Sequence, residues 1–221
     1  MITEFFIILI FIMSGILLRR VKSFPDNTSY ILNLMVIWVA LPAVIFLQIP
    51  KIHFTSQALV PALTPWLIIL TFSGLTLLFG KLINCERKTL GALLLLVPLG
   101  NTSFLGIPMV KIFFSVDSIP YAIIYDQLGS FLGLGIYGVL IVSIYASGEK
   151  VQIKSVLIKM ITFPPFVSLL LALLLSFYFK KYGADYPLLI NKLLKTTAIT
   201  LVPMAMIAVG FQFKLKLTRK G

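Results

Sequence analysis

The sequence predicts an all-α integral membrane protein, and its composition, hydropathy and run lengths support that fold class. Of the 221 residues, 59% are hydrophobic and 12% are charged, whereas a soluble domain carries about 25% charged residues. The mean hydropathy is +1.05. Apolar runs recur at close to the length of about 20 residues that a helix needs to cross a bilayer. Lipid is therefore the expected solvent for most of the chain.

Seven apolar runs predict seven membrane-spanning helices joined by short loops. Basic residues follow the first run rather than precede it, which favours a retained helix over a cleaved signal peptide. The predicted spans are 3–18, 29–48, 58–80, 90–113, 119–146, 156–179 and 195–213.

The net charge of +12 comes from 19 Lys and Arg residues, most of which lie in the predicted loops. With an external N-terminus, thirteen of the 19 fall on the cytoplasmic side and six on the other, as the positive-inside rule expects. We predict a multi-pass protein of the cell (cytoplasmic) membrane with its N-terminus outside. Some basic residues are expected to contact anionic lipid headgroups. Nucleic-acid binding is not expected, because no basic patch is interleaved with stacking aromatics.

The sequence does not carry the residues of a typical enzyme site. Its single histidine, His53, and its single cysteine, Cys85, both fall in predicted loops, so a Cys/His metal cluster within one chain is excluded. It has no His-Glu-x-x-His helix and no nucleophile elbow. We therefore expect neither an enzyme nor a cofactor.

The most informative stretch is Gly100–Pro108, which reads GNTSFLGIP in the middle of the fourth predicted span. Gly100 and Gly106 allow the chain to leave helical geometry without a Cβ penalty, and Pro108 removes a backbone N–H. A helix interrupted at membrane depth persists only beside protein or a water-filled cavity, and such breaks form substrate sites in secondary transporters. The alternative is a merely kinked helix that packs through small residues.

The residue types in this stretch suit an anionic ligand. Side chains of Asn101, Thr102 and Ser103 offer hydrogen bonds, and a half-helix that starts there presents unpaired N–H groups with a partial positive charge. Lys111 is expected to snorkel to the membrane interface. The predicted substrate-binding residues in this span are Gly100, Asn101, Thr102, Ser103, Gly106 and Pro108.

Asp126 is the only acidic residue deep in a predicted span. A carboxyl group in the membrane is costly and usually faces a cavity, so Asp126 is predicted to carry a coupling H⁺ or Na⁺. The alternative places it near enough to the interface to reach headgroups or water. Gln127, beside it, is a further candidate for the substrate site. Asn33 and Pro42 in the second span either line the cavity or only cap and kink their helix.

An internal repeat is indicated by two similar spans. Leu41-Pro42 in span two and Val202-Pro203 in span seven are each followed by an apolar half-turn, at an offset of 161 residues. Such a unit holds five spans, and an odd number inverts the second copy in the membrane. Residues 1–146 are then a first five-helix repeat with a crossover helix at 90–113, and residues 147–221 are the first two helices of an incomplete second repeat.

Several motifs resemble the auxin efflux carrier family over nearly the whole chain. Pro98–Thr102 and Gly106-Ile107-Pro108 are similar to its crossover helix. Weaker matches are Asn33 with Leu41-Pro42, Pro164-Pro165, and Pro203 with Val209-Gly210.

The resemblance implies a bile-acid symporter-like fold of ten helices in two inverted repeats, whose fourth and ninth helices are broken and cross. It also implies substrates such as malonate or malate, moved by alternating access. Compared with that pattern, the sequence ends after its seventh helix, so we expect an inverted-repeat fold truncated to about seven helices.

The function expected from these features is secondary active transport of a small organic anion. One alternative is a degenerate or truncated membrane protein without autonomous transport, and another is a Na⁺-coupled symporter of the bile-acid type. The expected partners are the anion, membrane lipids, a coupling H⁺ or Na⁺, and further copies of the chain in a homo-oligomer.

Overall fold

The computed structural model describes residues 2–51, 58–145 and 152–213, and every regular element in these ranges is helical. The all-α fold class is therefore confirmed. Cys85 is half-buried in the turn after α4. His53 lies outside the described residues.

Several helices join end to end through wider π-helical turns, which are named η1 (Val36–Ala40), η4 (Thr102–Gly106), η6 (Tyr125–Phe131) and η7 (Leu134–Gly138). The α-helices are α1 (Ile2–Leu18), α2 (Thr28–Met35), α3 (Leu41–Gln48), α4 (Leu59–Leu82), α5 (Arg87–Leu96), α6 (Ile107–Phe113), α7 (Ile119–Ile124), α8 (Val139–Tyr145), α9 (Ile153–Ile161), α10 (Pro164–Tyr182), α11 (Leu188–Ile199) and α12 (Leu201–Gln212).

Five helical segments of the described chain are long and apolar enough to cross a membrane. Two of the seven predicted spans are shorter helices, Phe5–Leu18 and Thr102–Phe113, the second because its predicted span is broken. The five long segments are Thr28–Gln48, Leu59–Leu82, Val116–Tyr145, Pro164–Tyr182 and Leu188–Gln212.

The sequence boundaries of the last two spans are wrong. A single helix over 156–179 was expected, but α9 ends at Ile161 and a new helix starts at Pro164. Pro164 and Pro165 explain the break, because neither has an N–H to continue the helical ladder and each restricts the residue before it. Span seven begins at Leu188, before the predicted residue 195, and its two helices meet at Thr200.

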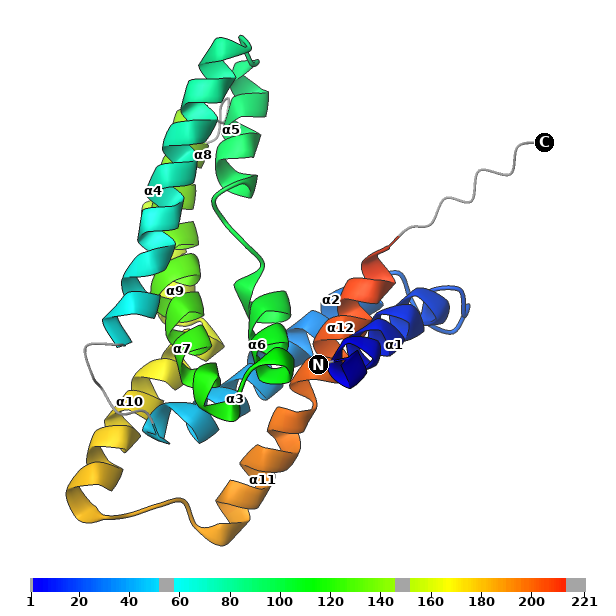
Figure 1. Ribbon diagram of the computed structural model, residues 1–221, viewed down its shortest axis with the longest axis vertical. Coiled ribbons are helices and arrows are strands. Elements are labelled where there is room, and N and C mark those ends of the chain that lie inside the picture. Colours follow the sequence, from blue (N-terminus) through cyan, green and yellow to red (C-terminus); the bar gives the residue numbers. More distant parts are fainter. Residues whose placement is uncertain (1, 52–57, 146–151, 214–221) are drawn as a thin grey trace.

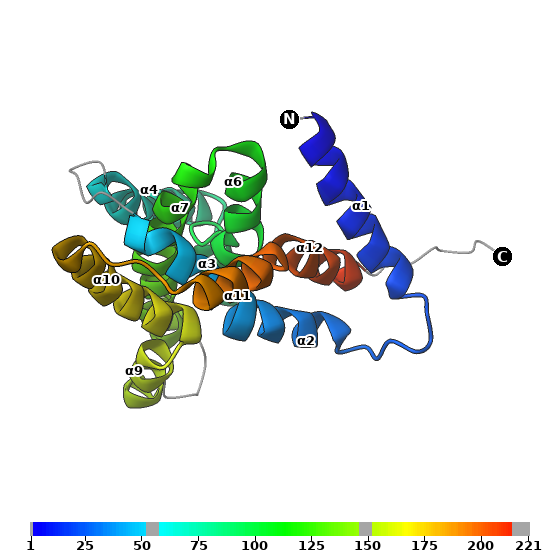
Figure 2. The same cartoon turned by 90° about the horizontal axis from the view of Figure 1, so that it is seen from below.

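The helices form two limbs (Figure 1). The central limb, upright in Figure 1, contains α4, α5, α7 and α8 from the middle of the chain. The terminal limb contains α1, α2, α3, α10, α11 and α12, and Figure 2 shows α11 and α12 running beside α2 and α3. α6 lies between the limbs, in contact with α7 and α12.

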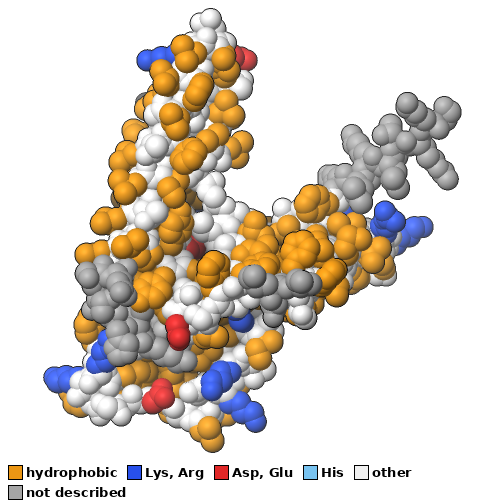
Figure 3. Space-filling model, in the orientation of Figure 1, with side chains coloured by type: hydrophobic (Ala, Val, Ile, Leu, Met, Phe, Trp, Pro, Cys, Tyr) orange, Lys and Arg blue, Asp and Glu red, His pale blue; other side chains and the backbone are white. Residues whose placement is uncertain are grey.

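Glycines on span five let the helices of the central limb approach closely. A Cβ on Gly129 would lie 2.0 Å from Pro65, and one on Gly133 would lie 2.5 Å from Ile69, both residues of α4. Small residues at these positions thus serve close packing of the two helices. Hydrophobic side chains cover the outer surface of this limb, while Lys and Arg side chains gather near the ends of the molecule (Figure 3), as expected for a membrane protein.

In the terminal limb, the first helix of each predicted repeat packs against the second span of the other. α1 packs on α12, and α10 packs on α3. Gly15 of α1 meets the backbone of α12, where an added Cβ would lie 2.2 Å from the Ile207 carbonyl oxygen. The residue 161 positions after Gly15 is Ser176 of α10, which donates a 3.3 Å hydrogen bond to the Pro50 carbonyl at the end of span two. Two inverted units would pair in this way, although the repeat and its boundaries stay a prediction.

We predict that Gly15→Ala destabilises the protein by about 1–3 kcal/mol, because the new methyl group would overpack the contact between two backbones. Gly74→Ala is the matched control, since a Cβ there meets nothing within 4 Å. The measurement is the unfolding midpoint in detergent. Equal midpoints for the two variants would show that α1 and α12 do not cross at Gly15.

Candidate functional site

The fourth predicted span is broken at membrane depth. α5 ends at Leu96, residues 97–101 are not helical, and helical structure resumes at Thr102 and continues to Phe113. Pro108 is buried at the start of α6, directly after the wide turn η4. The interruption predicted from Gly100–Pro108 is confirmed, and the alternative of a merely kinked helix is wrong.

Asn101 starts the second half of the broken helix. Its side-chain Oδ1 accepts the backbone N–H of Phe104 at 3.2 Å. Its backbone carbonyl accepts the N–H groups of Leu105 at 3.3 Å and Gly106 at 3.1 Å, which produces the wide first turn η4. Asn101 is therefore an N-cap whose oxygen is occupied, and its exposed amide nitrogen is the group available to a ligand.

The two glycines do not act as the sequence suggested. Neither glycine has a positive φ; among the described residues, the glycine with a positive φ is Gly183. Gly106 has helical φ and ψ angles of −62° and −55°. A Cβ on Gly100 would come no nearer than 3.8 Å to Thr102. What these positions provide is open space beside Thr102, not backbone freedom.

Span five supplies a buried carboxyl group to the break. Asp126 is 1% exposed. Its Oδ1 accepts the Thr102 hydroxyl, and the Ser103 hydroxyl lies 2.7 Å from Oδ1 and 2.8 Å from Oδ2. Asp126 is thus held inside the protein by the first turn after the break and does not reach the headgroup region.

Gln127 contacts Asp126 and does not itself line the cavity. Its Nε2 donates to Asp126 Oδ2 at 2.5 Å, while its Oε1 is buried without a hydrogen-bond partner in the described chain. An unpaired buried acceptor beside a carboxyl group is unfavourable, and it marks a place where a proton or cation would be stabilised.

Two cavities flank the break, and Thr102 lines both. The first, of about 310 Å³, is the more polar one. Ile37 of span two and Phe163 close parts of its wall. Its polar lining comes from Asn101, Thr102, Ser103, Asp126 and Ser130.

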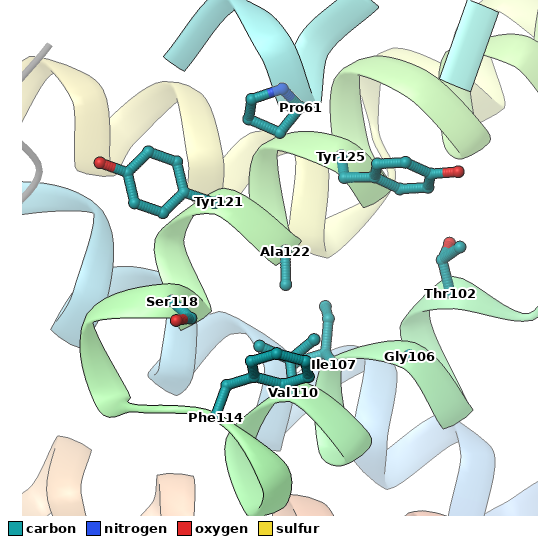
Figure 4. A pocket seen from close by; sticks show the side chains of 10 residues that line it. All are labelled: Pro61, Thr102, Gly106, Ile107, Val110, Phe114, Ser118, Tyr121, Ala122 and Tyr125. Atoms are coloured by element: carbon teal, nitrogen blue, oxygen red, sulfur yellow. The ribbon is translucent and has the colours of Figure 1, made fainter. Parts of the chain in front are cut away.

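The second cavity, of about 430 Å³, is apolar and lies between α6 and α7 (Figure 4). Ile107 and Val110 lie on α6 and Phe114 directly follows it, and Ala122 faces them from α7. Thr102 stands at its edge near Gly106. The break therefore separates a polar cavity from an apolar one.

The structure places the predicted substrate-binding residues in different environments. Gly100, Asn101, Thr102 and Ser103 line the polar cavity, and Gly106 lines the apolar one. The remaining four line neither of these two cavities, and their place in the substrate site stays a prediction: Pro108, Gln127, Asn33 and Pro42.

The surroundings of three of these residues differ. Pro42 lies in the first turn of α3 directly after η1, so it shapes the helix. Asn33 is half-buried on α2, one turn before the cavity-lining Ile37, so the two residues lie at different depths on one face of that span. Gln127 reaches the cavity only through Asp126.

Sequence reasoning missed or misplaced two other polar groups. The Tyr137 hydroxyl donates to the Leu94 carbonyl at 2.8 Å. Tyr137 follows Asp126 by eleven residues, about three helical turns, and this spacing could have indicated that both lie on one face of span five.

Lys111 does not snorkel to headgroups, because its Nζ donates to the Ala198 carbonyl at the end of α11 at 2.9 Å. A cation at a helix C-terminus is favourable.

Comparisons with known proteins agree with this architecture. The model of the family described as membrane transport protein matches residues 1–218. The chain belongs to this family. The match also confirms the resemblance to the auxin efflux carriers. An uncharacterized transporter of Methanocaldococcus jannaschii is 32% identical over 220 residues, which are 97% of this chain and 70% of that protein. No solved structure is significantly similar to the chain.

We predict that Asn101→Ala lowers stability by about 1 kcal/mol, because it removes the N-cap of the second half-helix. Asn101→Ser should restore most of that loss, since a serine oxygen also caps. Thermal unfolding in detergent measures both variants. If serine is no better than alanine, Asn101 does not act as a cap.

Proposed function

We propose that the protein is a secondary active transporter that moves a small organic anion, such as malonate or malate, across the cell membrane by alternating access. Membership of a membrane transport family supports the general class. The observation that carries the finer proposal is the bond between the break and Asp126, because it joins a ligand-sized polar cavity to a titratable group.

The substrate carboxylate is assigned to the start of the second half-helix. There the amide nitrogen of Asn101 and the first N–H groups of η4 face a cavity of about 310 Å³. An anion at this point gains from the partial positive charge of a helix N-terminus without requiring a buried arginine.

Asp126 makes the binding of anion and cation interdependent. Its carboxyl group lines the same cavity, so an ionised Asp126 would repel the substrate at short range in a poorly screened environment. A proton or Na⁺ on Asp126 removes that repulsion, and the two ligands then favour each other's binding. If a proton binds, a half-turn of the Gln127 side-chain amide would exchange the positions of its oxygen and nitrogen. The protonated Asp126 would then donate to Oε1 across the 2.5 Å contact, and Oε1 would gain a partner.

The first test is uptake of radiolabelled malonate and malate by proteoliposomes under an imposed pH or Na⁺ gradient. We expect one of the two gradients to stimulate wild-type uptake and Asp126→Asn to remove that stimulation. The size expected for such a coupling is a change of about 5–150-fold in the affinity for the anion when the cation is bound. Asp117→Asn, in the exposed loop before α7, is the matched control.

The outcomes separate the alternatives. An Asp126→Asn variant that still responds to the gradient would contradict the coupling role. Stimulation by Na⁺ alone would favour the Na⁺-coupled symporter. Flux no greater than that of empty vesicles for the unmodified chain would favour a membrane protein without autonomous transport.

A second test separates capping from ligand binding at Asn101. Asn101→Ser keeps an acceptor for Phe104 but lacks the amide donor, so the apparent KM should rise about tenfold, as for the loss of one hydrogen bond to a charged group. The measurement is the apparent KM for the transported anion. An unchanged KM would remove Asn101 from the substrate site.

A further inference from the structure

We propose that Tyr137 is a positioning residue for the site, and that its hydroxyl group fixes the point at which the chain leaves α5. This inference rests on the proposed function for its transport readout, although its structural part can be tested separately. Tyr137 lines neither cavity, so any effect on substrate must act through the break itself.

The need for such a residue comes from Pro98. In a regular helix the carbonyl of Leu94 would accept the N–H of residue 98, and proline has none. The last regular bond at this end is from the Val97 N–H to the Leu93 carbonyl, at 2.9 Å. Leu94 is 1% exposed, so water and headgroups do not replace the missing donor.

Tyr137 supplies the donor from the neighbouring span. Its O–H lies 2.8 Å from the Leu94 carbonyl oxygen. The Ser73 hydroxyl of α4 lies 2.8 Å from the Tyr137 oxygen and also contacts the Ile69 carbonyl, so its single hydrogen serves one of these two acceptors. This chain of hydroxyl groups joins three spans of the central limb at the end of α5 and orients the phenol toward Leu94.

Span five therefore holds both edges of the break. Asp126 binds Thr102 and Ser103 at the start of the second half-helix, and Tyr137 binds Leu94 near the end of the first. Residues 97–101 lie between these anchors without helical structure. Their shape, and hence the position of Gly100 and Asn101 in the polar cavity, is set by the separation of the two anchors along one helix.

The variant that tests this is Tyr137→Phe, which keeps the ring and removes the donor. We expect the apparent KM of uptake to rise about five- to tenfold, with the maximal rate within about twofold, because the binding-competent shape of the break is less populated. Ser73→Ala is a milder second variant that should move KM in the same direction. Tyr178→Phe is the control, since that tyrosine is exposed on α10 and has aromatic neighbours.

Hydrogen exchange followed by mass spectrometry provides a readout without substrate. In Tyr137→Phe, the amides of residues 93–97 should exchange faster, while those of α10 stay unchanged. Faster exchange with no anion flux in any variant would support the anchor and reject the proposed transport. Exchange equal to that of Tyr178→Phe, or faster exchange with an unchanged KM, would overturn the positioning role.

Discussion

The structure depends on one constraint, which is that a backbone polar group inside a bilayer has to find its partner within the protein. The chain contains 12 prolines, and several lie inside apolar spans, where each removes one donor from the helical ladder. In two places a tyrosine from another element donates to the carbonyl group that a proline leaves unpaired. Tyr137 and Leu94 are one case.

A second case lies in the terminal limb. Pro50 deprives the Phe46 carbonyl of its donor, and the Tyr186 hydroxyl replaces it at 2.9 Å. Tyr186 lies in the loop between α10 and α11, where burial, with a smaller contribution from Asp185, raises its pKa to about 12. The phenol therefore remains a donor throughout the physiological pH range. Both tyrosines bind carbonyl groups four residues before a proline.

The sequence was most predictive where local chemistry decides the outcome. Gly100–Pro108 marked the place of the break, but Pro98 ends the first half-helix and Asn101 caps the second, each by acting on its own local backbone. Asp126 was identified because a carboxyl group deep in an apolar run needs a reason to be there. Its bond with Thr102 and Ser103 was not predicted, since it depends on the rotation and depth of span five relative to span four. For the same reason the sequence left open whether Asn33 and Pro42 line the cavity or only cap and kink their helix.

Lys111 attaches the second half of the broken helix to the terminal limb. The second half of the broken helix carries the ammonium group, and the acceptor is the Ala198 carbonyl of the terminal limb. Movement of one limb past the other must release a desolvated cation before any new acceptor can receive it. Such a step has an energy barrier. The second half of the broken helix would therefore occupy discrete positions relative to the terminal limb.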